Sequence, residues 1–166
     1  MDLLLREAQP SDAEAIVAIL NPIIEAGEYT VLDRHLTTEF ERQYIANFPR
    51  RGVFFVAESR QDHRVVGLQS LEPFATYTHA FDHVAVMGTY VGLPYQRQGI
   101  GTHLSKATFE AARRVGYEKI LTYVRADNVA SLAFHLRLGF RIVGTAQRQA
   151  RIGQRYVDEI IVERFL

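Results

Sequence analysis

The 166-residue sequence has no cysteine and no tryptophan, and its 19 Lys and Arg residues are balanced by 19 Asp and Glu residues. Without cysteine the chain can form no disulfide, thiolate metal site, iron–sulfur cluster or thiol nucleophile. A net charge of zero argues against binding to nucleic acid or an anionic membrane, because both favour clustered basic residues. No apolar run approaches the length of a membrane span, and the apolar start Leu3 to Leu5 is too short for a signal peptide. We therefore expect a cytoplasmic protein that binds neither nucleic acid nor a membrane.

What the sequence does contain indicates one packed domain. Hydrophobic residues make up 48% of the chain, and no repeat, charge block or flexible linker divides it. A chain of this length can bury about two-thirds of its unfolded surface without disulfides or metals. We expect a single domain spanning residues 1–166.

Hydrophobic periodicity predicts an α/β protein. We expect four helices, at 11–27, 38–48, 99–115 and 130–138. The expected strands lie at 3–6, 53–57, 65–68, 83–91, 119–124, 140–144 and 156–165. A strand–helix–strand crossover in the second half requires at least one parallel pair within a mixed sheet.

Local signals refine the ends of these helices. Ser11 with Glu14, and Thr38 with Glu41, have the spacing of capping boxes at two helix starts. Pro22 should kink or split the first helix, because it lacks an N–H and clashes with the preceding turn.

The most informative segment follows the strand that ends at Val91. Gly99 and Gly101 open a helix there, and a helix N-terminus offers unpaired N–H groups that suit phosphate. The glycines would let the phosphates approach the backbone closely, and Arg97 would add positive charge. The dinucleotide-binding fingerprint is incomplete, since Leu104 replaces its third glycine, and the chain has no Gly-Lys pair for a P-loop.

Two motifs resemble those of the GNAT acetyltransferase superfamily. The run Gln96 to Gly101 reads Gln-x-x-Gly-x-Gly and follows Val91-Gly92-Leu93-Pro94, like the central motif of that family. Asn128 to Phe140 is similar to its second signature, an Asn followed by a helix that ends in Gly-Phe. The order of elements also matches, and within the superfamily the chain looks most like the phosphinothricin/L-amino acid N-acetyltransferase branch.

The resemblance implies the GNAT fold: a central mixed sheet with two splayed parallel strands, flanked by about four helices. Acetyl-CoA would lie between the strands that end near Val91 and Val124, and no metal is implied. The implied cofactor-binding residues are Val91 and Leu93 through their main chain, the loop residues Gln96, Arg97, Gln98, Gly99, Ile100, Gly101 and Thr102, and Asn128 with Ser131.

The resemblance also implies direct transfer of the acetyl group to a primary amine. The Val91 N–H would stabilise the oxyanion that develops on the thioester. His135 stands where the family usually has a Tyr, and it would protonate the leaving thiolate.

The general base is less well defined, because Val86 occupies the position where this branch often has a Glu. Among the carboxylates and imidazoles that could replace it we favour Glu28. The alternatives are Asp82, His83, Asp158, Glu159 and a chain of water molecules.

We therefore expect an N-acetyltransferase that acts on a small-molecule amine such as an amino acid or an analogue. Two alternatives are a protein N-terminal or lysine acetyltransferase and a non-catalytic acyl-CoA-binding module. A nucleotide-binding protein is a third. By analogy with the family, a homodimer is a further possibility.

Overall fold

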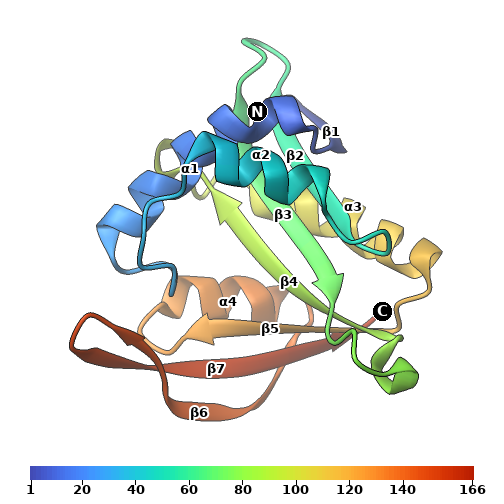
Figure 1. Ribbon diagram of the computed structural model, residues 1–166, viewed down its shortest axis with the longest axis vertical. Helices are drawn as coiled ribbons and strands as arrows, with labels where there is room; N and C mark the ends of the chain where they lie inside the picture. Colours follow the sequence, from blue (N-terminus) through green and yellow to red (C-terminus); the bar gives the residue numbers. More distant parts are fainter.

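Seven strands form one mixed sheet in the computed structural model, which describes residues 1–166. The spatial order is β1-β2-β3-β4-β5-β7-β6, as Figure 1 shows. The strands are β1 (Leu3–Glu7), β2 (Val53–Ser59), β3 (Val65–Pro73), β4 (Val84–Val91), β5 (Lys119–Arg125), β6 (Arg141–Ile152) and β7 (Arg155–Phe165). Only β4 and β5 are parallel, so the predicted mixed sheet with a parallel pair is confirmed.

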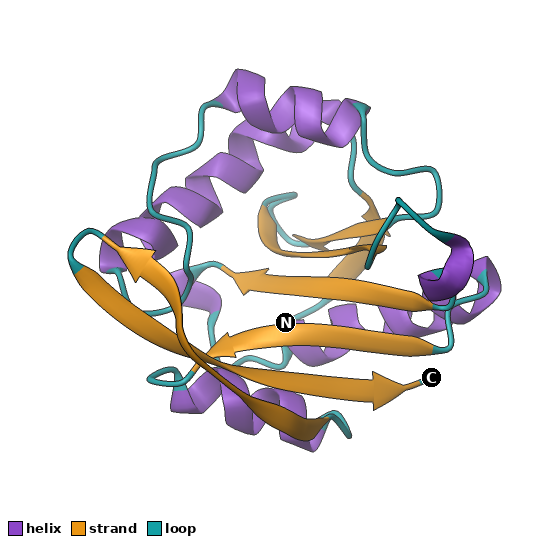
Figure 2. Ribbon diagram, turned by 60° about the horizontal axis from the view of Figure 1, so that its bottom comes forward, coloured by secondary structure: helices purple, strands orange, loops and turns teal.

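Four α-helices cover the two faces of this sheet (Figure 2), as predicted. They are α1 (Ala13–Ala26), α2 (Thr38–Ala46), α3 (Ile100–Val115) and α4 (Val129–Arg137). The apolar stripes of α1 and α2 pack on one face around Phe54 and Leu68. On the other face Phe109 of α3 and Leu132 of α4 share a core with Ile120. None of the helices is both long and apolar enough to cross a membrane.

The feature that positions the site is the separation of β4 from β5. The two strands pair only where Val84–Val86 lies beside Lys119–Leu121, and beyond this point they diverge (Figure 1). The Thr122 hydroxyl donates a hydrogen bond of 2.8 Å to the Met87 carbonyl, which marks the start of the gap.

Backbone groups of β4 point into this gap. In a strand each residue directs its N–H and C=O groups to the same side, and the next residue directs its own groups to the opposite side. The Met87 carbonyl faces β5, whereas the Gly92 N–H bonds the Val66 carbonyl on the β3 side at 3.0 Å. Thr89 and Val91 therefore present their main-chain groups to the gap.

Both predicted capping boxes are wrong in detail. Helix α1 begins at Ala13 after a 3₁₀ turn, Pro10–Asp12. Asp12 instead accepts hydrogen bonds from the Gln9 N–H and from Arg6, because β1 places that arginine beside the turn.

The second helix is capped one residue earlier than expected. The hydroxyl of Thr37, not Thr38, accepts from the Phe40 N–H at 3.1 Å. Glu41 is buried with 3% of its surface exposed, and its carboxylate makes no hydrogen bond to the backbone at the start of the helix, so the box is not closed.

Two further predictions change with the structure. Pro22 does not split α1, which continues to Ala26 and ends at Gly27 in the left-handed conformation. Strand β6 runs to Ile152, well beyond the predicted residue 144, with register shifts at Ile142/Gly144 and Ala146/Ala150. These bulges break the alternation of side chains, which hid the strand from the sequence pattern.

Candidate active site

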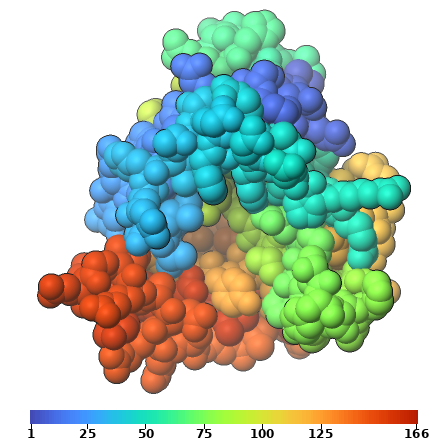
Figure 3. Space-filling model, in the orientation of Figure 1, coloured from blue at the N-terminus to red at the C-terminus, as the bar shows by residue number.

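A cavity of about 640 Å³ lies between the end of β4, the loop and first turn of α3, and the helix α4. Figure 3 shows a hollow on the face bordered by the α1–α2 segment (blue), the β6–β7 hairpin (red) and the β3–β4 connection (green). Arg97 and Arg137 line the cavity and no carboxylate does, so its surroundings favour an anion. The predicted residues on its wall are Val91, Gln96, Arg97, Gly99, Ile100, Gly101, Thr102, Asn128, Ser131 and His135.

The loop before α3 presents a run of free backbone donors. None of the N–H groups of Arg97–Gly101 donates to a protein acceptor. On either side, the Gln96 N–H reaches the Leu93 carbonyl at 3.5 Å, and the Thr102 N–H bonds the Gly99 carbonyl at 3.0 Å. The run of free donors is therefore shorter than the segment Gln96 to Thr102 that the resemblance implies for the diphosphate. Such a run at a helix N-terminus binds phosphate.

The two glycines of this loop serve different purposes. Gly99 has φ of +81°, and the nearest atom to an added Cβ, in the His103 ring, is 4.0 Å away, so its backbone conformation is what excludes other residues. At Gly101 an added Cβ would lie 3.0 Å from the Phe134 ring, so that glycine allows α3 to pack against α4. Arg97 also adopts a positive φ, of 63°, an uncommon conformation for a residue with a side chain.

Three predicted residues lie outside both cavities of the site. Leu93 packs its side chain into the core beneath α1. The exposed Gln98 donates to the Pro94 carbonyl at 3.4 Å. Glu28 is also exposed, and the structure does not bring this predicted base to the cavity wall.

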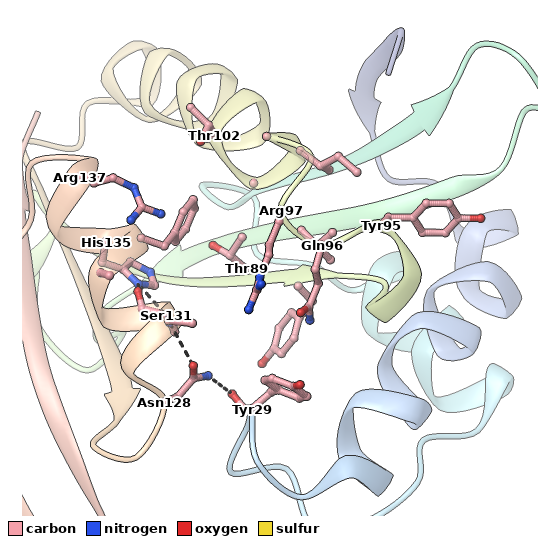
Figure 4. Close-up of a pocket in the computed structure, with 18 of the residues that line it drawn as sticks. Tyr29, Thr89, Tyr95, Gln96, Arg97, Thr102, Asn128, Ser131, His135 and Arg137 are labelled. Carbon is pink, nitrogen blue, oxygen red and sulfur yellow. Dashed lines mark hydrogen bonds between the residues drawn. The ribbon is translucent and has the colours of Figure 1, made fainter.

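His135 lies at the centre of the site, buried in α4 with 5% of its surface exposed. Its Nδ1 lies 2.8 Å from the Ser131 carbonyl, as the dashed line in Figure 4 shows. A carbonyl only accepts, so Nδ1 carries the proton and Nε2 is left free in the neutral ring. Burial lowers the pKa of His135 below its usual value, an effect that outweighs the hydrogen bond to Ser131.

A second cavity, of about 260 Å³, adjoins the first. It lies in the gap between β4 and β5, beneath the α1–α2 segment, and Tyr123 and Glu159 line it. The residues that line both cavities are Tyr29, Thr89, Tyr90, Ser131 and His135. His135 thus lies at the boundary between an anion-binding cavity and a smaller neighbouring one.

The α1–α2 segment covers both cavities, and Arg125 holds it in place. Its Nη1 donates to the Gly27 and Thr30 carbonyls at 2.8 and 2.9 Å, while Nε and Nη2 bind the Asp127 carboxylate. Asn128 adds a bond of 3.3 Å from its amide to the Tyr29 carbonyl. Its Oδ1 accepts from the Ser131 N–H at 3.0 Å, so Asn128 also caps α4.

Replacing this arginine should loosen the roof. We expect Arg125→Met to lower the free energy of unfolding by about 2–3 kcal/mol, because it leaves the Gly27 and Thr30 carbonyls without their donor. Urea unfolding measures the loss. Arg114→Met is the control, because Arg114 and Glu110 are exposed on α3 and such pairs contribute less than about 1 kcal/mol. Equal losses in the two variants would show that Arg125 does not hold the segment.

Several residues of the site were not predicted. Arg137 follows Ala130, Ala133 and Phe134 on one helical stripe, with spacing i, i+3, i+4 and i+7, and all four line the larger cavity. The combination of two small residues and a terminal arginine is the signal that could have identified it. Tyr29 and Tyr95 also line this cavity, and no local pattern distinguishes them.

Fold and site together define a class of protein. A gap between two parallel strands, with a phosphate-binding loop at one end and a buried imidazole beside it, suits an elongated, phosphate-bearing cofactor. The model of the Acetyltransferase (GNAT) family matches residues 16–140, and the chain belongs to this family. The predicted resemblance is confirmed.

Relatives agree with this assignment. The L-methionine sulfoximine/L-methionine sulfone acetyltransferase of Pseudomonas aeruginosa is 26% identical over 161 residues, covering 94% of this chain and 88% of the relative. The phosphinothricin N-acetyltransferase of Streptomyces coelicolor is 24% identical over 162 residues, covering 96% and 94%. The crystal structure of a ribosomal-protein-alanine N-acetyltransferase from Brucella melitensis has a TM-score of 0.90 and 28% identity, covering 98% of this chain and 99% of that one. The first two names match the predicted branch.

Proposed function

We propose that the protein transfers the acetyl group of acetyl-CoA directly to the primary amine of a small molecule. The observation that carries the proposal is the contact between the two cavities at His135 and Ser131. One cavity has the donors for a polyanionic cofactor, and the other has room for a small acceptor. Their shared wall is where the two substrates would react.

The residues present fit acetyl-CoA, whose thioester supplies the activated acetyl group. The free N–H groups of Arg97–Gly101 would hold the diphosphate, with Arg97 and Arg137 adding positive charge. The free edge of β4 would pair with the pantetheine arm. At its end the Val91 N–H would stabilise the negative charge that develops on the carbonyl oxygen.

His135 would carry the proton between the substrates. Its neutral ring leaves Nε2 able to accept a proton from the attacking amine, and the same nitrogen can then protonate the leaving sulfur. This extends the predicted role of an acid, because the burial that lowers the pKa of His135 favours the proton-accepting form at the start of the reaction. Glu28 is not needed in this scheme.

The size and roof of the smaller cavity favour a small acceptor over a peptide. Its volume is about 260 Å³, and Arg125 and Asn128 hold the α1–α2 segment across it. The relatives from Pseudomonas and Streptomyces are named for small amino acid analogues, which supports the same choice. The single domain, the cytoplasmic location and the homodimer stay predictions from the sequence.

Transfer is tested by incubating the protein with acetyl-CoA and a panel of amines. We expect CoA release, detected with a thiol reagent, to match the mass of an acetylated amine. Direct transfer predicts sequential rather than ping-pong kinetics. Tight binding of acetyl-CoA without acetylation of any amine would instead identify a non-catalytic binding module.

A further inference from the structure

The smaller cavity contains a carboxylate that nothing in the protein neutralises. Glu159, on β7, lines this cavity and only 8% of its surface is exposed. Its side chain takes part in none of the hydrogen bonds or ion pairs of the fold. Burial raises the pKa of Glu159, and desolvation is the only cause. An unpaired buried carboxylate is unfavourable in a folded protein, which points to a partner outside the chain.

The register of the sheet makes this isolation unexpected. Glu159 lies directly opposite Arg125 in the pairing of β7 with β5, the position where an ion pair would form across two strands. The Arg125 guanidinium turns away and makes four hydrogen bonds, to Asp127 and to the Gly27 and Thr30 carbonyls. Arg125, the cation paired with Glu159 in the sheet register, therefore binds the α1–α2 segment and Asp127 and does not neutralise Glu159.

The other groups of this cavity make it suited to a cation. Apart from Arg125, no Lys or Arg side chain lines it. His135 is held in its neutral form by burial, and Tyr29, Tyr90 and Tyr123 contribute aromatic walls. A ligand would meet one carboxylate, aromatic faces and no free positive charge. Aromatic faces and a carboxylate both attract an ammonium group, whereas a carboxylate on the ligand would have no partner.

We propose that Glu159 binds the ammonium group of the acceptor, and that the preferred acceptor is a primary amine with no carboxylate on the neighbouring carbon. This inference rests on the proposed acetyl transfer and narrows its substrate class. Unlike an amino acid, such an acceptor carries no negatively charged carboxylate next to its ammonium group. From Glu159 the amine faces His135, which lines the same cavity and can take up the proton that the amine must lose before it attacks.

The substrate class is tested with compounds that share one side chain. L-Methionine, L-methioninamide and 3-(methylthio)propylamine are compared at equal concentrations of free amine. We expect kcat/KM for the amide and the propylamine to exceed that for the amino acid by about tenfold or more, since a buried unpaired carboxylate is strongly disfavoured. Equal or greater activity on the free amino acid would overturn the proposal.

The role of the residue is tested with Glu159→Gln. We expect KM for the propylamine to rise about ten- to a hundredfold, the range for losing a hydrogen bond to a charged group. We expect kcat and the affinity for acetyl-CoA to change little. The melting temperature should rise by about 2–4 °C, because an unpaired buried charge is removed.

Glu41→Gln is the matched control. Glu41 is also a buried carboxylate whose pKa is raised by burial alone, but it lines neither cavity. It should share the gain in melting temperature and leave KM unchanged. An unchanged KM in Glu159→Gln, with a wild type that acetylates the propylamine, would refute this inference alone. A wild type that acetylates no amine would refute the proposed function as well.

Discussion

Gly99→Val is expected to weaken acetyl-CoA binding about thirtyfold. Gly99 has φ of +81°, and a β-branched residue is a strong outlier at such an angle. The free loop is expected to relax and so escape a strain of about 2 kcal/mol, and the N–H groups of Arg97–Gly101 then no longer converge on the diphosphate. Binding acetyl-CoA must restore the strained loop, which corresponds to about thirtyfold in affinity. Isothermal titration with acetyl-CoA measures the loss.

The control is Gly116→Val at the opposite end of the same helix. Gly116 has φ of +97° and no atom within 4 Å of an added Cβ, so it experiences the same backbone strain far from the cavity. We expect it to lower thermal stability and leave acetyl-CoA affinity intact. Gly101 is less suitable for this test, because a side chain there would collide with Phe134. Equal affinity in Gly99→Val and wild type would remove the phosphate-binding role of the loop.

The order of elements could be predicted because each depends on a local pattern. The apolar stripe that ends at Gly27 defines α1, and Gly139, with φ of +84°, follows α4 as predicted. The helix start that failed involves a contact with another element of the fold. Arg6 of β1 binds Asp12, and the first helix begins at Ala13 rather than directly after Ser11.

The site also has one part that the sequence predicts and another that only the structure identifies. The phosphate-binding loop could be predicted because its donors are consecutive residues. Glu159 was one of several candidate bases, and only the structure shows that its partner in register, Arg125, binds the α1–α2 segment instead. Whether Glu159 is paired depends on which acceptors bind Arg125 in the folded protein, and the spacing of residues in the sequence does not predict this.

His135→Gln is expected to lower kcat about a hundredfold or more, the typical contribution of a positioned acid or base. Glutamine is polar and close to histidine in size, but it cannot exchange a proton. The affinity for acetyl-CoA should stay within about threefold, because the substituted residue mainly serves the chemical step. Steady-state kinetics with the best amine of the panel, together with titration of acetyl-CoA, separates the two effects.

The pH dependence distinguishes a proton carrier from a packing residue. Burial lowers the pKa of His135, and its neutral form is the active one. The wild-type kcat, to which Glu159 contributes little, should therefore stay high below the ordinary histidine value of about 6.5 and fall only as the pH drops through the lowered pKa. His135→Gln should lose this acidic limb. His63→Gln is the control, because His63 lies exposed in the β2–β3 turn, and it should keep the limb.

The free energy of unfolding should also depend on the protonation of His135, and the lowered pKa fixes the direction of the change with pH. Below about pH 6.5 the unfolded chain takes up a proton at His135 that the folded protein resists. The free energy of unfolding of the wild type should therefore decrease as the pH falls from about 6.5 to the lowered pKa. In His135→Gln this part of the decrease should be absent, as urea unfolding at pH 7.5 and 5.5 would show. A variant that keeps both the wild-type kcat and the wild-type pH dependence of stability would exclude His135 as the proton carrier.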